Sequence, residues 1–415
     1  MGKESRKKII VIGGGPAGMA AAIAASMDGA SVAILEGNPR VGKKLLATGN
    51  GRCNYTNSGI EISRYHGKNP GFAKSALGRF DSAAAVDFFE RLGVYHREED
   101  GGKIFPMSGQ ASSVLDVLRY QLKSEGIDVV CDAHADGISC LSDGGFAVNL
   151  RDGRRFKSDR IILATGGMAG PQFGSDGSGY QLARHMGHRI TEIFPALVQL
   201  KLRGGFLKAI SGVKFDGTAE VISSAGILRR ESGEILFTDY GISGPPILQL
   251  SRAASELLSR KERVVLKVMI VDYLTASQLD ELIIRRLSSA PKKTLCFSFV
   301  GFLNKRLIPV MLKEAGIEDI NKPSCCVTAD ERRSIVRVLK GWEFEVTGTA
   351  PWSSAQVTSG GVDLSGINPK TMESKIVPGL YFAGEVIDID GDCGGYNLQW
   401  AWSSGFAAGE SAAAD

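Results

Sequence analysis

The feature that most constrains this 415-residue chain is a glycine-rich turn near its start, from Gly13 to Gly18, with glycine at its first, third and sixth positions. An apolar run at 8–12 precedes the turn and predicts a buried strand. A run rich in alanine follows at 15–27 and predicts a helix, and a second strand is expected at 31–35. Together these segments form a βαβ unit of about 30 residues, the frame of a dinucleotide-binding fold.

Each glycine of the turn has a separate physical task in such a fold. Gly13 permits the tight turn, Gly15 lets a pyrophosphate approach the backbone, and Gly18 lets the helix pack closely on the strand. The positive end of the helix then stabilises the phosphate charge. Glu36 ends the second expected strand, where an acid accepts hydrogen bonds from ribose hydroxyls. The pattern predicts a cofactor that contains ADP, and the acid favours FAD or NAD over a cofactor with a 2′-phosphate.

Composition excludes several classes of protein. The chain has 43% hydrophobic and 23% charged residues, which is ordinary for a globular protein and excludes a disordered or fibrous chain. Its 52 glycines stand beside only 14 prolines, which indicates many tight turns rather than low complexity. Seven cysteines without any C-x-x-C pair, and only five histidines, argue against a zinc site and favour a reduced, cytoplasmic protein. Because no uninterrupted apolar stretch reaches about 18 residues, no membrane span is expected.

Periodicity along the rest of the chain predicts a change of architecture near residue 190. Helices are expected at 80–92 and 112–124, and strands at 127–130, 137–141, 146–150 and 156–163. Short strands interleaved with glycine follow up to about 240, and a helix is expected from about 246. The region 272–320 is mostly helical in pattern, and strands are expected again at 325–327 and 342–346. The segment 379–414 is typical of strand, loop and then helix, with the helix from about Trp400.

Charge is uneven between these parts. Residues 190–340 carry 23 Lys and Arg against 16 Asp and Glu, a net charge of +7, and the rest of the chain carries −3, which together make the +4 of the whole chain. Adjacent basic pairs stand in this region: Arg285 with Arg286, Lys292 with Lys293, and Lys305 with Arg306. These pairs belong either to solvated helix faces or to a dock for an anionic partner such as RNA.

Two later segments distinguish between the candidate cofactors. The apolar run from Arg160 ends in Ala164-Thr165-Gly166-Gly167, and a second apolar run from Gly379 ends in Ala-Gly-Glu at 383–385. Both endings are typical of flavoproteins, in which a glycine-rich loop and a helix follow the last strand and the helix directs its positive end at the flavin. A plain NAD dehydrogenase needs neither segment. Since no second G-x-G-x-x-G follows a strand, a separate NAD(P)H domain is not expected.

A glycine-rich polar segment after the second strand makes the resemblance to a family specific. It reads GNGRCNYTN at 49–57, and further matching segments run through the chain in order: IFP (104–106), ATGG (164–167), FTDYGISGPPILQLS (237–251), AQVTSGGVD (355–363) and TMESKIVPGLYFAGEVIDIDGDCGGYNLQWAWSSG (371–405). With these residues the chain resembles the BaiN/RdsA family of FAD-dependent oxidoreductases, also known as aminoacetone-oxidase-like flavoproteins. One departure is Asp239, where many relatives have His, and this puts any histidine-based role at that position in doubt.

The resemblance implies an α/β architecture in three parts. A glutathione-reductase-type Rossmann FAD domain, with a parallel sheet and a β-meander, is interrupted by a β-rich domain that carries a helical subdomain. The boundaries expected for this chain are 1–189 and 351–415 for the FAD domain, 190–271 and 322–350 for the β-rich domain, and 272–321 for the helical subdomain.

The resemblance also implies a reaction. Family members reduce a carbon–carbon double bond conjugated to a carbonyl, by hydride transfer from the reduced flavin, and NAD(P)H is the expected electron donor. The substrate is then uridine in 23S ribosomal RNA, giving dihydrouridine, or a steroid-like or bile-acid-like enone. Two alternatives remain open: an FAD-dependent amine (aminoacetone) oxidase that releases hydrogen peroxide, and a non-catalytic FAD-binding scaffold for RNA or protein. The oligomeric state cannot be predicted.

Site residues follow from the motifs and from the resemblance. Arg52 is a candidate for stabilising negative charge or is a structural arginine; Cys53 is a candidate proton donor or a packed small residue; Tyr396 is a candidate acid or a stacking ring. The five histidines, at 66, 96, 134, 185 and 188, show no triad spacing and no evident partner. The residues expected to bind the cofactor are Gly13, Gly14, Gly15, Pro16, Ala17, Gly18, Glu36, Lys44, Thr48, Gly49, Gly51, Arg52, Cys53, Asn54, Ala135, Thr165, Gly166, Gly167, Gly384, Glu385, Gly395, Tyr396, Asn397 and Leu398. No metal is expected.

Overall fold

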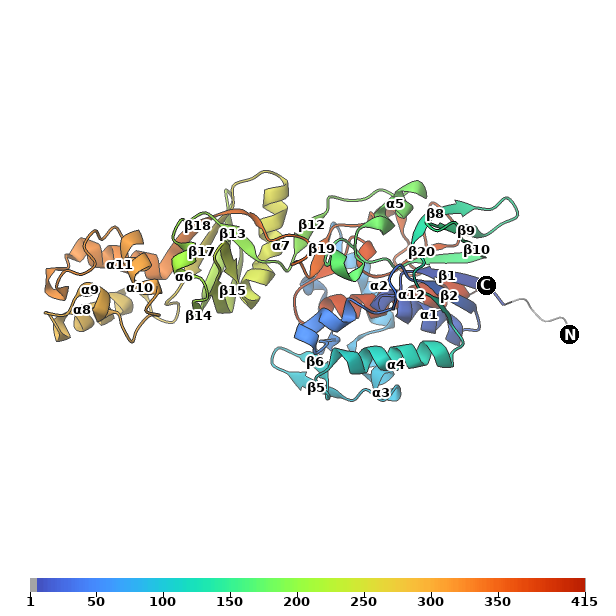
Figure 1. The fold of residues 1–415 in the computed structure, drawn as a ribbon, viewed down its shortest axis with the longest axis horizontal. Coiled ribbons are helices and arrows are strands. Elements are labelled where there is room, and N and C mark those ends of the chain that lie inside the picture. Colours follow the sequence, from blue (N-terminus) through green and yellow to red (C-terminus); the bar gives the residue numbers. More distant parts are fainter. Residues whose placement is uncertain (1–5, 415) are drawn as a thin grey trace. The chain divides into compact units, whose positions relative to one another are not determined.

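The structure is a computed structural model that describes residues 6–414 (Figure 1). These residues form two compact units. Unit 1 comprises the described residues up to Pro195 together with those from Ala355 onward, and unit 2 comprises Ala196–Ser354. The chain therefore leaves unit 1, builds unit 2, and returns to complete unit 1.

A five-stranded parallel sheet is the centre of unit 1, and its order is β20-β11-β1-β2-β7. The strands in that order are Leu380–Phe382, Arg160–Leu163, Lys8–Ile12, Ser31–Leu35 and Asp128–Val130. The apolar runs of β20, β11, β1 and β2 are nearly continuous, which is typical of buried strands in a parallel sheet. β1 and β2 have the bounds that the sequence predicts, and the helix between them, α1, spans Pro16–Met27. The predicted α/β class is thus confirmed.

The last helix, α12 (Tyr396–Ala413), packs closely along α1. A Cβ on Gly405 would lie 2.6 Å from the backbone oxygen of Ala17, and one on Gly409 would lie 2.3 Å from that of Ala21. Because both contacts advance by four residues in the same direction, the two helices run parallel. At 1.5 Å per residue, α12 reaches about 12 Å beyond the start of α1 on the N-terminal side.

Smaller sheets and helices complete unit 1 (Figure 1). The β-meander is β8 (Ala135–Cys140), β9 (Phe146–Leu150) and β10 (Arg155–Ser158). The other strands are β3 (Thr56–Asn57), β4 (Tyr65–His66), β5 (His96–Glu99), β6 (Lys103–Pro106), β12 (Phe194–Ala196, which ends at the boundary between the units), β19 (Val357–Ser359) and β21 (Asp390–Gly391). The other α-helices are α2 (Lys74–Arg79), α3 (Ser82–Arg91), α4 (Ala111–Ser124) and α5 (Ser178–His185).

One sequence expectation in unit 1 is corrected. The single strand expected at 156–163 is two strands, β10 and β11, in different sheets. Asp159 separates them, because its backbone N–H donates to the oxygen of Lys8 at 2.8 Å and its side chain accepts from the N–H of Lys8 at 2.7 Å. Because of these bonds, the chain passes from the last strand of the meander to the parallel sheet at Asp159.

Unit 2 is a closed barrel of six strands in the order β13-β16-β15-β14-β17-β18. The strands in that order are Leu200–Leu202, Gly241–Ser243, Gly226–Phe237, Lys214–Ser223, Val265–Met269 and Trp342–Thr349. Buried residues from several strands fill its core, among them Val221, Phe237 and Leu266. The helices of unit 2 are α6 (Leu207–Ile210), α7 (Pro245–Ser259), α8 (Ala276–Ser289), α9 (Leu295–Ser298), α10 (Leu307–Glu314) and α11 (Ala329–Gly341).

A second sequence expectation, a strand at 325–327, is also wrong. The segment Ser324–Cys326 is a 3-10 turn, η5, and it leads directly into α11. Thr328 caps this helix, because its hydroxyl accepts from the N–H of Glu331 and the Glu331 carboxylate accepts from the N–H of Thr328. This capping box marks a helix start, and it overrides the strand propensity of the short apolar run before it.

Three global properties of the described residues bear on function. No helix formed by residues 6–414 is long and apolar enough to cross a membrane. Within the same residues, no group of three or more His, Cys, Asp or Glu side chains is placed to hold a metal ion. All seven cysteines lie in this range, and none of them forms a disulfide.

Candidate functional site

The glycine-rich turn lies where β1, β2 and β11 end in unit 1. The N–H of Gly13 donates to the oxygen of Leu35 at 2.8 Å, and Gly13 has a φ of +104°. A Cβ on Gly13 would lie 2.6 Å from the oxygen of Ala164, and one on Gly18 would lie 1.9 Å from the oxygen of Gly13. Both positions therefore exclude a side chain, which packs the turn tightly between two strands and the first turn of α1.

The N-terminus of α1 is open by contrast. Gly15 is its N-cap and Pro16 its first residue, and no side chain of residues 6–414 caps the helix. A Cβ on Gly15 would meet no heavy atom within 4 Å in the described part of the chain. The uncapped N–H groups of the first turn, which includes Ala17 and Gly18, carry partial positive charge. An open, electropositive helix end beside a tight glycine turn fits a pyrophosphate.

Glu36 is fixed at the end of β2. Its carboxylate is buried and accepts from the N–H of Gly14 at 2.7 Å and from the N–H and side-chain amide of Asn38 at 2.8 and 2.7 Å. Each carboxylate oxygen has more than one lone pair, so the group retains capacity to accept from ribose hydroxyls. The oxygen of Glu36 also accepts from the N–H of Ala133, and this places Ala135, the first residue of β8, nearby. Asn38 carries no motif signal and was not predicted.

Lys44 and Glu385 meet, although 341 positions separate them. The Lys44 ammonium lies 2.8 Å from Oε2 of Glu385, and Oε1 of Glu385 accepts from the N–H of Thr358 at 2.8 Å. Thr358 was also not predicted, and its hydroxyl accepts from the N–H groups of Met168 and Ala169 at 2.7 and 2.9 Å. The segment after β2, the loop after β11 and the loop after β20 therefore converge.

The Ala-Thr-Gly-Gly ending of β11 is held in the same convergence. Gly166 has a φ of +72°, and a Cβ on Gly167 would lie 2.3 Å from the hydroxyl oxygen of Thr358. In the loop after β20, a Cβ on Gly384 would lie 2.6 Å from that of Ala17 in α1. Thr165 packs against the backbone of Gly179, where a Cβ would lie 1.8 Å from its hydroxyl oxygen. Glycine is thus required here for close approach of backbone segments.

The segment Thr48–Asn54 follows an unusual backbone path. Gly49, Gly51 and Cys53 have φ values of +56°, +83° and +61°, and only the first two lack a side chain. The N–H of Cys53 donates to the oxygen of Thr48 at 3.0 Å, and its thiol is fully buried. Burial raises the pKa of this thiol to about 12. The Asn54 amide donates to two backbone oxygens, at 2.9 and 3.0 Å.

Arg52 lies at the edge of this segment with its side chain 38% exposed. Its guanidinium forms an ion pair with Glu99 and stacks over the ring of Phe105 at 4.1 Å. Arg97 lies 2.6 Å from the same carboxylate. The two arginines hold the pKa of Glu99 below its usual value. Arg52 is therefore anchored on one side and accessible on the other.

The N-terminus of α12 is a second helix end without a side-chain cap, although its N-cap packs against the backbone of Thr56. Gly395 is its N-cap, with a φ of +97°, and among the described residues no side chain caps it. Tyr396 is buried, its hydroxyl donates to the oxygen of Gly59 at 3.4 Å, and burial raises its pKa. The Asn397 side chain pairs with the backbone of Gly391, at 2.8 and 2.7 Å, and so fixes the preceding loop. Leu398 is half-buried against the core.

Three histidines have partners that sequence spacing did not show. Nε2 of His66 lies 2.8 Å from a carboxylate oxygen of Asp392, Nδ1 of His96 lies 2.7 Å from Glu90, and Nε2 of His188 lies 2.8 Å from the hydroxyl of Ser374. The expectation that no histidine has a partner is thus wrong. His66 lies beside the loop that leads into α12, because β4 pairs with β21.

In unit 2 the six basic residues fall into two groups. Arg286 donates to the backbone oxygens of Ser298 and Val300, at 2.9–3.2 Å, and Arg306 donates to that of Ala209 at 3.1 Å, so both hold the fold together. The remaining four, Arg285, Lys292, Lys293 and Lys305, are exposed. Nζ of Lys293 lies 5.7 Å from the ring of Phe297, which is 58% exposed. Asp239 is exposed in the turn between β15 and β16.

Comparisons with known proteins give a family, two relatives and a similar fold. The family described as HI0933-like protein Rossmann domain matches residues 7–411. The chain is 40% identical, over 98% of its length and 99% of the relative, to a 3-dehydro-bile acid delta(4,6)-reductase of Clostridium scindens. It is 30% identical to a ribosomal RNA dihydrouridine synthase of Haemophilus influenzae, over 96% of both chains. A solved 3-ketosteroid delta1-dehydrogenase of Sterolibacterium denitrificans is 12% identical with a TM-score of 0.50, over 98% of this chain and all of that one, a likeness of fold.

Proposed function

Because the chain belongs to the HI0933-like Rossmann-domain family and is an oxidoreductase, we propose that it binds FAD and reduces a carbon–carbon double bond conjugated to a carbonyl. The observation that carries the proposal is the pair of uncapped helix ends in unit 1. α1 and α12 run parallel, and both begin without a side-chain cap among the described residues. One end suits a pyrophosphate, and the other suits a ring system that gains negative charge.

The residues around these two ends fit the cofactor. Glu36 accepts the ribose hydroxyls, and the first turn of α1 binds the pyrophosphate. The segment at 48–54 and the Gly384–Glu385 pair line the stretch between the two helix ends. The first turn of α12 faces the ring, because its N–H groups favour negative charge there. NAD(P)H is the proposed electron donor.

Reduced FAD supplies the hydride that adds to the β-carbon of the alkene. This chain must then stabilise negative charge at the carbonyl oxygen and provide a proton for the α-carbon. Arg52 suits the first task, since its guanidinium is accessible on one side and held by Phe105 and Glu99 on the other. Tyr396 suits the second, because its phenol carries a proton at neutral pH and the residue lies in the first turn of α12. The side chain of Cys53 is fully buried, so we propose that it lines the site and does not donate the proton.

Two substrate classes each have an observation in their favour. A steroid-like or bile-acid-like enone is favoured by the 40% identity to a reductase whose substrate is a bile acid derivative. Uridine in ribosomal RNA is favoured by four exposed cations of the adjacent basic pairs in unit 2 and by Phe297 beside Lys293. Basic side chains with an exposed ring suit phosphates and bases.

Anaerobic half-reactions test the proposal. The holoprotein is first reduced with NADH or NADPH, and the loss of flavin absorbance is recorded. A 4-ene-3-keto steroid is then added, and reoxidation of the flavin with a mass gain of two hydrogens in the steroid is the expected result. In parallel, ribosomal RNA from strains with and without the gene is digested and searched for dihydrouridine.

If neither substrate is reduced while a primary amine bleaches the flavin and oxygen then gives hydrogen peroxide, the chain is an amine oxidase. A flavin that no reductant bleaches would indicate a non-catalytic scaffold.

A further inference from the structure

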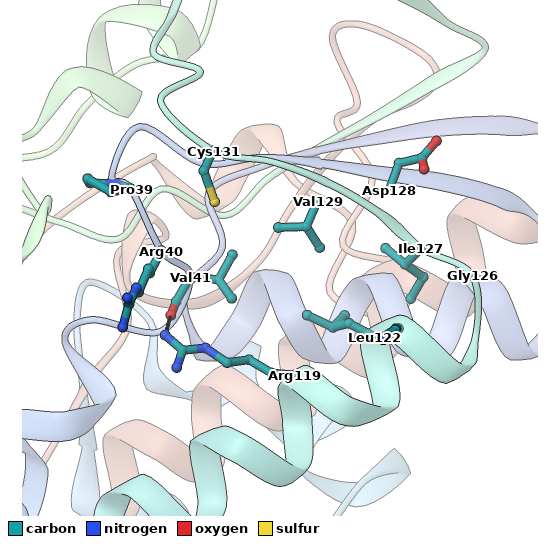
Figure 2. Close-up of a pocket in the computed structure, with 11 residues that line it drawn as sticks. Pro39, Arg40, Val41, Arg119, Leu122, Gly126, Ile127, Asp128, Val129 and Cys131 are labelled. Carbon is teal, nitrogen blue, oxygen red and sulfur yellow. Dashed lines mark hydrogen bonds between the residues drawn. The ribbon is translucent and has the colours of Figure 1, made fainter.

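A hollow of unit 1 lies at the edge of the parallel sheet formed by β7. It has a volume of about 600 Å³ and lies between α4, the edge strand β7 and the segment Pro39–Val41 after β2 (Figure 2). This volume falls within the usual range for small-molecule sites, about 300–1,000 Å³. Val41 separates it from the glycine-rich turn, because its Cγ1 occupies the place that a Cβ of Gly14 would need. The hollow therefore lies on the far side of Val41 from the glycine-rich turn.

The floor of the hollow is apolar. Leu122 of α4, Ile127 and Val41 are buried beneath it. Val129 of the edge strand is 39% exposed and points toward the space over α4 (Figure 2). Among the described residues β7 pairs on one side only, with β2, which leaves Val129 uncovered at the sheet edge. An apolar group that enters the hollow would remove this surface from water.

The rim of the hollow is cationic. Its charged lining residues, among those that the structure describes, are Arg40, Arg119, Lys123 and the single carboxylate Asp128. Arg40, Lys123 and Asp128 are exposed. Arg119 is half-buried and donates to the oxygen of Val41 at 2.7 Å, which fixes its guanidinium at the rim; its other amino group lies 3.6 Å from the exposed Asp116. The rim has an excess of positive charge over an apolar floor.

We propose that this hollow binds an amphipathic carboxylate, a molecule with one carboxylate group on an apolar body. The apolar body covers Val129, and the carboxylate meets Arg40, Arg119 and Lys123 at the rim. A purely hydrophilic anion such as inorganic phosphate would leave the floor exposed, and a neutral hydrocarbon would leave the cations without a partner. The proposal does not rest on the reaction proposed above, because the residues that line the hollow lie outside the first turns of α1 and α12.

Cys131 makes the site measurable. Its thiol lies at the wall of the hollow and is half-buried (Figure 2), whereas Cys140, in the meander of the same unit, is exposed and outside the hollow. A ligand in the hollow should shield the first thiol and leave the second unchanged. The two cysteines therefore provide a reporter and an internal reference in the same molecule.

The test uses the FAD-bound holoprotein, limiting iodoacetamide and decanoate as the probe. Peptide mass spectrometry then gives the alkylation rate of each cysteine. We expect saturable decanoate binding that slows alkylation of Cys131 at least five-fold and leaves Cys140 unchanged. Decan-1-ol, which has the same chain without the charge, should bind at least ten-fold more weakly. Calorimetric titration of both probes measures binding independently of the thiol.

Two variants complete the test. The double substitution Arg40→Glu with Lys123→Glu changes only exposed side chains, and it should weaken decanoate binding at least ten-fold. Lys157→Glu, a reversal of an exposed charge on β10 of the same unit, is the matched control and should leave binding unchanged. Equal binding of decanoate and decan-1-ol, an unprotected Cys131, or an equal effect of the two variants would overturn the proposal. Loss of C=C reduction alone would leave these binding results intact.

Discussion

Nε2 of His66 lies 2.8 Å from Oδ1 of Asp392, and this pair joins two segments 326 residues apart at the start of α12. The Asp392 side chain is 4% exposed and that of His66 is 22% exposed. Arg64 lies 3.5 Å from the other oxygen of Asp392. A carboxylate with so little solvent depends on such partners, because burial without them is costly. The pair therefore holds the loop before α12 in place.

Removal of the imidazole should consequently destabilise unit 1. His66→Ala leaves Asp392 with fewer partners in a buried position, and we expect a loss of about 1–3 kcal/mol in the free energy of unfolding. The matched control is His96→Ala, since His96 pairs with Glu90 but both side chains are 37% exposed. Exposed pairs of this kind contribute about 0–1 kcal/mol. Urea unfolding of the holoprotein measures both variants, and an equal loss in the two would show that the His66 pair has no special role.

Two glycines of the turn should respond to substitution in opposite ways. Gly18→Ala places a methyl group 1.9 Å from the oxygen of Gly13, and we expect a loss of about 1–3 kcal/mol from overpacking. Gly15→Asp places a good N-cap residue in open space, so the apoprotein should keep its melting temperature or gain slightly. Its charge would repel the pyrophosphate, and bound FAD per chain should fall at least ten-fold. Flavin absorbance and thermal melting give the two readouts.

Gly78→Asp is the control for this comparison, because a Cβ on Gly78 also meets open space but the residue lies in α2. It should retain full FAD content. Full FAD content in Gly15→Asp would contradict the assignment of the α1 N-terminus to the cofactor.

The buried thiol of Cys53 should make stability depend on pH in the alkaline range. Its pKa is raised to about 12 in the folded chain, from a usual value of 9.0. A group whose folded pKa is raised contributes fully below the unfolded value and loses its contribution as pH rises toward the folded value. Each pH unit between 9 and 12 should therefore cost about 1.4 kcal/mol through this thiol. We expect Cys53→Ala to flatten the fall in unfolding free energy between pH 9 and 10.5 by about 2 kcal/mol.

Cys140→Ala, at an exposed position, should leave that fall unchanged. Tyr65, whose pKa burial also raises, contributes equally to all three proteins. Burial raises the pKa of Tyr55 as well, and Cys53 adds to that shift, so the comparison reports the thiol together with its effect on Tyr55. Parallel pH curves for Cys53→Ala and the unsubstituted protein would contradict a buried, neutral Cys53.

The sequence predicted elements whose determinants are local. β1, the turn and β2 follow from contiguous apolar runs and three glycines, and the structure has them within one residue. The start of α12 was expected near Trp400 and lies at Tyr396, because Gly395 rather than an apolar residue ends the loop. Pairs such as His66 with Asp392 have no sequence signal, since only the β4–β21 ladder brings them together. The same holds for Thr358, whose hydroxyl binds the loop after β11.

The basic residues of unit 2 illustrate the same limit, because adjacent cations in the sequence have different roles. Arg286 is bonded to the oxygens of Ser298 and Val300, whereas Arg285 is exposed. Arg286→Ala should therefore lower stability by about 2 kcal/mol, since several hydrogen bonds to buried backbone are lost. It should not be used as a test of binding.

Charge reversal of the four exposed cations (Arg285, Lys292, Lys293 and Lys305) should instead weaken binding to a ribosomal RNA fragment and leave the fold intact. If each cation meets one phosphate, the slope of log K against log salt concentration should decrease in magnitude by about 3. Phe297→Ala should weaken binding without changing this slope, because stacking on a ring releases no counterion. Filter binding or fluorescence anisotropy at several salt concentrations measures both effects. Reduction of a steroid enone by the same variants should be unchanged. An unaltered salt slope with full RNA affinity would exclude these four cations as RNA-binding residues.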